Sequence, residues 1–68
     1  MKEAKILYAF RCHSFSYYFC EFINSHGHPI YGLCPSKEVY EVGARAPIGF
    51  IKQGKEYKMY IKKGVVAL

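Results

Sequence analysis

The segment KILYAFRCHSFSYYFCEFI, Lys5–Ile23, is the part of this chain that best indicates its architecture. It contains two segments rich in aromatic and β-branched residues, Lys5–Cys12 and Tyr17–Ile23, on either side of a break that contains serine and histidine. Segments of this composition are typical of β-strands, and such breaks are typical of turns. The stretch therefore predicts an antiparallel hairpin with its turn over residues 13–16.

The chain continues as a three-stranded meander. A second turn over residues 25–28 contains a glycine that can adopt positive φ, and it returns the chain as Pro29–Leu33. The expected register places Phe10 opposite Phe19 and Phe22 opposite Tyr31. Both faces of this meander carry apolar side chains, so both need cover. We expect one face to meet the C-terminal half, and the other to meet a second subunit or a partner.

A second hairpin is predicted from Ile48–Lys52 and Glu56–Lys62, with its turn around residues 53–54. Apolar and basic side chains alternate along it, which indicates one face for the core and one for solvent. Its twelve residues from 52 to 63 hold a single acid, Glu56, and five lysines. These lysines are Lys52, Lys55, Lys58, Lys62 and Lys63.

Two further segments are less regular. Residues 36–42 admit either a short helical turn, which Ser36 would cap, or a short strand. The β propensity of Val39 and Val42 favours the strand. Residues 65–68 form a short apolar tail that is suited to closing a barrel or to pairing with another chain's edge.

These elements predict one all-β domain over residues 1–68, with five to six short strands. We expect a small antiparallel sheet or a partly open SH3-like or OB-like barrel. A core of this size is marginal without a staple or a partner. Because 51% of the residues are apolar and 18% are aromatic, some apolar surface should remain outside the core, which predicts a homodimer.

The three cysteines and three histidines lack the spacing of a metal site. Structural zinc sites take ligands in close pairs such as C-x2-C, whereas seven residues separate Cys12 from Cys20. The predicted register places Cys12 and Cys34 on one face of the meander and Cys20 on the other. An odd cysteine count also argues against a disulfide scaffold, so we expect free thiols and no metal.

No motif in the chain indicates catalysis or a family. It has no glycine-rich phosphate loop, no paired carboxylates and no nucleophile elbow. We therefore expect a binding protein without a cofactor. Arg11 ends the apolar run Ile6–Phe10 well short of a signal or membrane span, so we expect a cytoplasmic protein.

The net charge of +5 favours an anionic partner. Lysines neutralise phosphates, and exposed aromatic rings stack on the bases of single strands. The first hypothesis is therefore that nucleic acid binds the second hairpin, with Arg11, Tyr18 and Arg45 extending the surface. The predicted binding residues are Lys52, Lys55, Lys58, Tyr60, Lys62 and Lys63.

The alternative hypothesis is a protein–protein interaction module, such as a small regulatory subunit or an inhibitor of a larger cytosolic protein. Tyrosines are enriched at such interfaces because they combine an apolar ring with a polar hydroxyl. The exposed aromatic face of the meander would then carry binding, while lysines steer the approach of an acidic protein surface. The predicted interface residues are Tyr8, Tyr17, Tyr18 and Tyr31.

Overall fold

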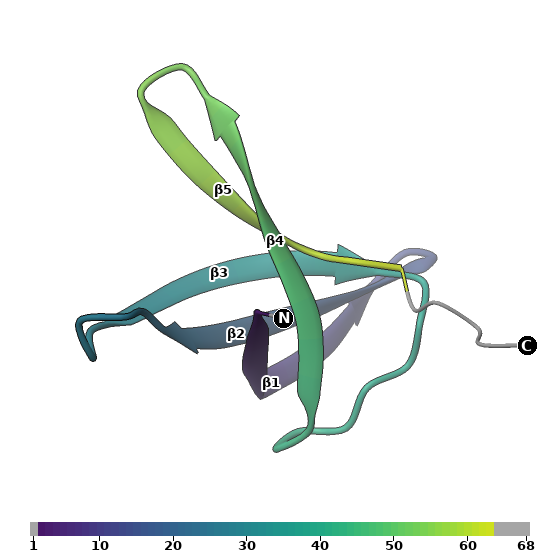
Figure 1. Ribbon diagram of the computed structural model, residues 1–68. Coiled ribbons are helices and arrows are strands. Elements are labelled where there is room, and N and C mark those ends of the chain that lie inside the picture. The colour runs from purple at the N-terminus through teal and green to yellow at the C-terminus, as the bar shows by residue number, and fades with distance from the viewer. Residues whose placement is uncertain (1, 64–68) are drawn as a thin grey trace, which may run out of the picture.

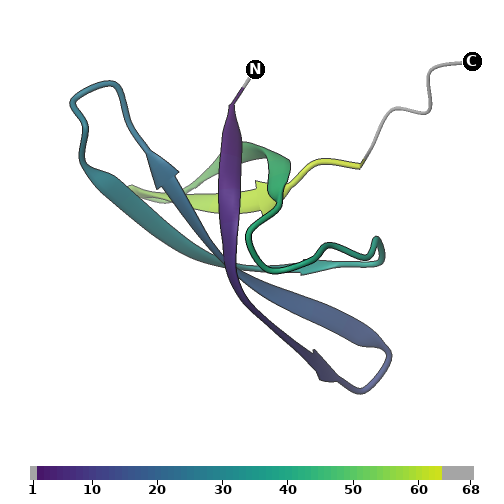
Figure 2. The same cartoon turned by 90° about the horizontal axis from the view of Figure 1, so that it is seen from below.

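The computed structural model describes residues 2–63, which form one five-stranded antiparallel sheet (Figure 1). The strands are β1 (Glu3–Cys12), β2 (Phe15–Ile23), β3 (Pro29–Ser36), β4 (Arg45–Gln53) and β5 (Glu56–Ile61). Their order across the sheet is β3-β2-β1-β4-β5. The sheet curls until its two end strands, β3 and β5, come into contact (Figure 2). This nearly closed barrel confirms the predicted all-β fold and fits a small SH3-like or OB-like barrel.

The β1–β2 hairpin is tighter than predicted. Phe10 pairs with Tyr17 instead of Phe19, because the turn contains only two residues, His13 and Ser14. A shift of two positions keeps each side chain on its predicted face. The predicted four-residue turn was wrong, but this error alone moved no residue into or out of the core.

A β-bulge in β1 changes the faces further along the strand. Ile6 pairs with Cys20, whereas Tyr8 pairs with Phe19, so Leu7 is an extra residue on β1. A bulge of this kind lets one strand change its alternation relative to its neighbour. Ile6 therefore points into the core, while Tyr8 lies on the outer side of the sheet.

The loop between β2 and β3 is one residue longer than predicted. Phe22 pairs with Ile30 instead of Tyr31, and residues 24–28 form the loop. The side-chain oxygen of Asn24 accepts hydrogen bonds from two backbone N–H groups of this loop, each at 2.9 Å. These bonds stabilise the longer loop.

A slip of one residue moves every side chain of a strand to the opposite face. Cys34 therefore points inward beside Cys20, and both side chains are fully buried. Gly32 also faces inward, opposite Cys20. Tyr31 and Leu33, in contrast, are about half exposed on the outer side. The predicted grouping of the cysteines and of Tyr31 was wrong for this reason.

The core fills the inside of the barrel with small and medium side chains. Its buried residues are Ala4, Ile6, Tyr18, Cys20, Cys34, Ala46, Ile48 and Met59. Phe22 and Phe50 extend the core towards the open end, where their rings meet edge-on with centroids 5.6 Å apart. The predicted second hairpin is present as β4 and β5, but its turn lies at Gly54 and Lys55 instead of residues 53–54.

Residues 37–44 form turns and bends with neither helix nor strand, so both predictions for residues 36–42 were wrong. The buried hydroxyl of Tyr18 holds this loop. It donates a hydrogen bond to the carbonyl oxygen of Glu38 and accepts one from the N–H of Tyr40, each at 3.0 Å. The loop follows this buried hydroxyl instead of its own β propensity.

The predicted apolar tail at residues 65–68 lies outside the described part of the chain. Within residues 2–63, no helix is long and apolar enough to cross a membrane.

Candidate nucleic-acid interface

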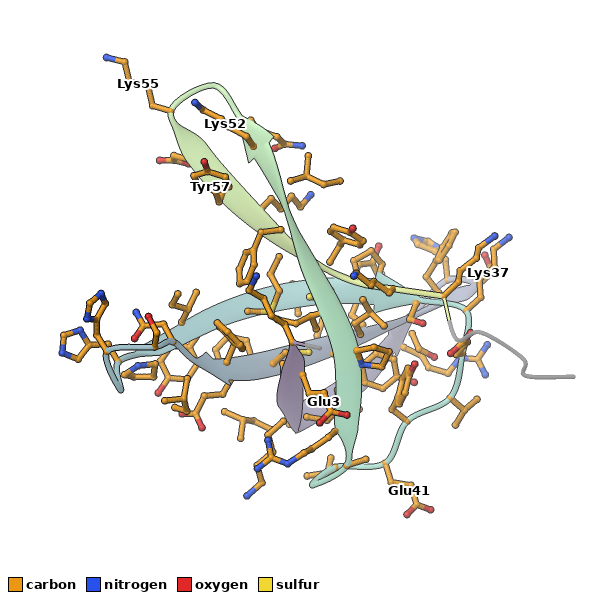
Figure 3. The ribbon with its side chains drawn as sticks, in the orientation of Figure 1. Glu3, Lys37, Glu41, Lys52, Lys55 and Tyr57 are labelled. Carbon is orange, nitrogen blue, oxygen red and sulfur yellow. The ribbon has the colours of Figure 1, made fainter. Side chains whose placement is uncertain are left out.

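The lysines predicted to bind nucleic acid do not share one surface. Lys52 lies on the core side of the β4–β5 hairpin, whereas Lys58 projects from its opposite side. Lys55 occupies the turn at the tip of the hairpin (Figure 3). Lys62 and Lys63 follow the last residue of β5, at the other end of the strand. These lysines are close together in the sequence but lie on different surfaces, because side chains alternate along a strand and because β5 separates the turn from Lys62 and Lys63.

Tyr60 does not stand free among these lysines. It pairs with Gly49 across the hairpin, and its ring lies over the space that a side chain would occupy there. A Cβ on Gly49 would lie 2.6 Å from the ring. Tyr60 is accordingly half-buried, and part of its ring surface stabilises the hairpin.

Another surface does bring exposed aromatic rings together: the outer side of β1, β2 and β3. Side chains alternate along each strand, so residues between the core positions gather there. We call this surface the aromatic face. It comprises Tyr8, Phe10, Phe15, Tyr17, Phe19, Tyr31 and Leu33.

Rings on the aromatic face stack on one another across the strands. Phe10 and Tyr17 have centroids 5.5 Å apart and an interplanar angle of 13°. Phe19 and Tyr31 are also 5.5 Å apart, at 2°. Tyr8 extends the first pair, with its centroid 6.1 Å from that of Phe10. Tyr8 and Tyr31, at the ends of these groups, are 61% and 51% exposed, so part of each ring faces solvent.

Three of the four tyrosines predicted for a protein interface, Tyr8, Tyr17 and Tyr31, lie on the aromatic face. Tyr18 is only 2% exposed and belongs to the core, because consecutive strand residues point to opposite faces. Its predicted exposure was therefore wrong, both as an interface anchor and as an extension of the basic surface.

The phenylalanines and Leu33 of the aromatic face were not among the predicted site residues. The signal was available in β2, where Phe15, Tyr17 and Phe19 occupy alternate positions. A strand with aromatic residues at these positions, and buried residues between them, presents the aromatic rings on one side.

Cations border the aromatic face at the end where β1 begins. Lys5 and Arg45 are opposite each other on β1 and β4. Both project outward, because their strand neighbours Ala4 and Ala46 are fully buried. Glu21 is opposite Lys5 on β2 and is the acid of this row.

Cations also border the other end and the β3 side. A hollow of about 290 Å³ lies at the other end of the face. It is lined by Phe15, Pro35, Ser36, Lys37, Glu38 and Lys63. Lys58 lies along the β3 side, where it lines a groove together with Tyr31 and Leu33. Five cations therefore border the aromatic face on three sides, together with the acids Glu21, Glu38 and Glu56.

One hydrogen bond links the acid to the rings. The Tyr31 hydroxyl donates to the Glu21 carboxylate at 3.0 Å. This hydrogen bond, with the nearby negative charge, raises the pKa of Tyr31. The hydrogen bond connects Tyr31, which stacks on Phe19, to Glu21 on the neighbouring strand.

Two of the three cysteines lie inside the barrel, and the third pairs with Phe15 at the edge of the aromatic face. Cys20 and Cys34 are buried free thiols, and Cys12 is exposed near the first turn. A hydrogen bond with Cys20, together with burial, raises the pKa of the Cys34 thiol. A buried, protonated thiol is a poor nucleophile. Among residues 2–63, no three His, Cys, Asp or Glu side chains are grouped so that they could hold a metal ion.

No protein-family model, curated protein or solved structure matches this chain. The surface itself is therefore the basis for a functional argument.

Proposed function

We propose that this protein binds single-stranded nucleic acid on the aromatic face, without catalysing a reaction. One observation carries the proposal: exposed aromatic rings gather on one side of the sheet, and cations surround them. Proteins that bind single strands combine these two elements, since bases stack on rings while phosphates follow positive charge. The proposed binding surface is therefore on β1, β2 and β3, whereas the sequence predicted the β4–β5 hairpin.

The spacing of the rings favours a single strand over a duplex. Successive outward residues on a strand are about 7 Å apart, because each residue advances the chain by about 3.4 Å. This is about twice the 3.4 Å rise per nucleotide of helical DNA. A stretched single strand can match the wider spacing, whereas a duplex hides the faces of its bases.

The charged residues support binding with little sequence preference. Four of the five bordering cations are lysines and one is Arg45. Lysine presents a compact charge to phosphates, whereas arginine is the usual residue for bidentate contacts with bases. Stacking is sequence-tolerant, because every base has a flat face.

Substitution of exposed tyrosines tests the proposal. Labelled random-sequence single-stranded DNA and RNA should bind at low salt, more tightly than duplex of the same length. Tyr8→Ala and Tyr31→Ala should each weaken this binding about tenfold, since stacking contributes about 1–3 kcal/mol per base. Tyr57→Ala is the matched control, because Tyr57 is 67% exposed but lies outside the aromatic face. Equal losses in all three variants, or no binding at low salt, would contradict the proposal.

A protein partner is the second candidate for the same face. Leu33 and Phe10 are 48% and 40% exposed, and contiguous apolar surface of this kind marks many protein interfaces. This candidate includes a homodimer. Light scattering distinguishes it: a dimer mass that Tyr31→Ala converts to a monomer, with no oligonucleotide binding, would favour the protein partner.

A further inference from the structure

The barrel is open where the β4–β5 hairpin rises away from β3 towards its tip (Figure 1). A hollow of about 480 Å³ lies at this open end. We call it the mouth, and it is lined by Lys2, Ile30, Phe50 and Tyr57. Ile30 belongs to β3, Phe50 to β4 and Tyr57 to β5, so curling of the sheet brings the walls together from three strands.

The three strand residues give the mouth apolar walls. The half-buried ring of Phe50 packs edge-on against Phe22, with centroids 5.6 Å apart. Ile30 and Tyr57 are 37% and 67% exposed, so their apolar atoms are available to a ligand. Small-molecule sites combine apolar walls with few charged groups, and the mouths of β-barrels are common places for them.

Among the described residues, Lys2 is the one charged residue that lines the mouth. Its backbone carbonyl oxygen accepts a hydrogen bond from the Ile48 N–H at 3.0 Å, which holds it alongside β4. Its side chain is on the inner side of the sheet, because Ala4, two positions further, is fully buried. A second hollow of about 540 Å³ adjoins the mouth: both are lined by Lys2 and Phe50, and Lys62 adds a second cation there.

The charges around the mouth are of one sign. No acidic residue among positions 2–63 lines either hollow. Glu3 and Glu56 are next in the sequence to Lys2 and Tyr57, but adjacent strand residues point to opposite faces. Both glutamates therefore project to the outer side of the sheet, and the lining favours an anionic group over a cationic one.

We propose that the mouth binds a small amphipathic carboxylate, with its apolar chain against Ile30, Phe50 and Tyr57 and its carboxylate at Lys2. Contact with the chain removes apolar surface from water. The Lys2 ammonium is a compact cation that pairs with the single carboxylate. The site is on the inner side of the sheet and the aromatic face is on the outer side, so this is a second function, independent of nucleic-acid binding.

Titration with decanoate, followed by the backbone amide resonances in NMR spectra, tests the proposal. We expect the resonances of Ile30, Phe50 and Tyr57 to shift and to saturate at about 1 mM decanoate or below. Butyrate has the same charge but a short chain, and should bind more weakly by about tenfold or more. Decyltrimethylammonium has the same chain length but the opposite charge, and should also bind about tenfold more weakly.

Substitution of lysines tests the position of the carboxylate. Lys2→Met removes the charge but keeps a long side chain, and should weaken decanoate binding about fivefold, which is the loss typical of an exposed ion pair. Lys55→Met is the matched control, because Lys55 lies in the turn at the hairpin tip and lines neither hollow. It should leave the affinity unchanged.

Several results would overturn the proposal. These are equal weakening by the two lysine variants, equal affinity for butyrate and decanoate, and no saturation at millimolar decanoate. A dimer mass in light scattering, with no decanoate-induced shift at the mouth, would show that a second copy covers this site instead.

Two tyrosine variants separate this site from the aromatic face. Tyr57→Ala removes a wall of the mouth and should weaken decanoate binding about fivefold. Tyr8→Ala should leave decanoate binding unchanged. For oligonucleotides the expected order is the reverse, so each proposal can fail without the other.

Discussion

At the scale of single residues, Gly32 allows β5 to approach β3. A Cβ on Gly32 would lie 2.9 Å from the Cβ of Met59 and 3.1 Å from its sulfur. In folded proteins a Cβ atom essentially never lies within 3.0 Å of another side chain's Cβ. The Met59 side chain is also buried. The absence of one side chain on β3 thus lets the barrel nearly close.

We predict that Gly32→Ala destabilises the protein by about 1–3 kcal/mol, which is the usual cost of overpacking a core. Urea unfolding measures the change. In a Met59→Gly background both the Cβ and the sulfur of Met59 are absent, so the added methyl group has room and Gly32→Ala should cost at least 1 kcal/mol less there. An equal cost in both backgrounds would show that the contact with Met59 is not responsible.

Tyr40 is a second residue with a measurable consequence. Burial, followed by its 2.8 Å hydrogen bond to the Glu38 carboxylate, raises the pKa of Tyr40 to about 12. An unfolded tyrosine has a pKa of about 10. The folded form therefore retains its proton where the unfolded form loses it. The stability that Tyr40 contributes is complete below about pH 10 and is lost as the pH rises towards 12.

We predict that the urea midpoint of the wild-type protein falls between pH 10 and pH 12 relative to that of Tyr40→Phe. The variant has no hydroxyl to titrate, so the difference between the two proteins isolates Tyr40 from the other tyrosines and the lysines. Parallel pH profiles would contradict the raised pKa.

At the scale of elements, the β1–β2 and β4–β5 hairpins have turns of the same kind. Each has two residues, and the first of them has positive φ: 58° at His13 and 63° at Gly54. This is the pattern of a type II′ turn, in which glycine is preferred at the first position. The β4–β5 hairpin has the preferred glycine, Gly54, whereas the β1–β2 hairpin has His13 at positive φ.

We predict that His13→Gly stabilises the protein by about 0.5–1 kcal/mol, because glycine adopts positive φ without the steric cost of a Cβ. Gly54→Ala should destabilise it by a similar amount. Ser14→Gly is the control and should destabilise slightly, since it only adds freedom to the unfolded chain. Urea unfolding of the three variants gives the order, and a loss of stability in His13→Gly would contradict the turn assignment.

At the scale of the whole molecule, curling of the sheet separates its two sides in function. The inner side is filled by the core, and the outer side of β1, β2 and β3 displays the aromatic face. Cations from β1, β4, β5 and the 37–44 loop then border that face. β1 supplies rings and one cation, Lys5, whereas the other four cations come from outside the three strands of the aromatic face.

The salt dependence of binding tests this arrangement. For single strands, the logarithm of the affinity falls with the logarithm of salt concentration, with a slope of about 0.7 per phosphate neutralised. We predict that the double variant Lys37→Ala/Lys63→Ala reduces the slope by about 1.4. The double variant Lys52→Ala/Lys55→Ala removes the same charge from the hairpin tip and should leave the slope unchanged. If instead only Lys52→Ala/Lys55→Ala reduced the slope, the binding site would be on the β4–β5 hairpin.

The positions of the strands were predictable from composition, but their registers were not. All five strands overlap the predicted segments, because aromatic and β-branched residues concentrate there. The registers depended on a histidine with positive φ, a bulge at Leu7 and the hydrogen bonds of Asn24. Each of these three features is one of several local conformations of similar energy, and the packing of the folded protein selects among them.

The candidate site shows the same division. Composition predicts a small all-β protein, as a sheet or a partly open barrel, with an excess of lysines and aromatic rings, because strand propensity and net charge are sums over residues. Which rings share a surface, and which cations border it, depends on strand register and on the curl of the sheet, and these appear only in the folded protein. A one-residue change in loop length turned Tyr31 outward and Cys34 inward, since the faces of a strand alternate with every residue.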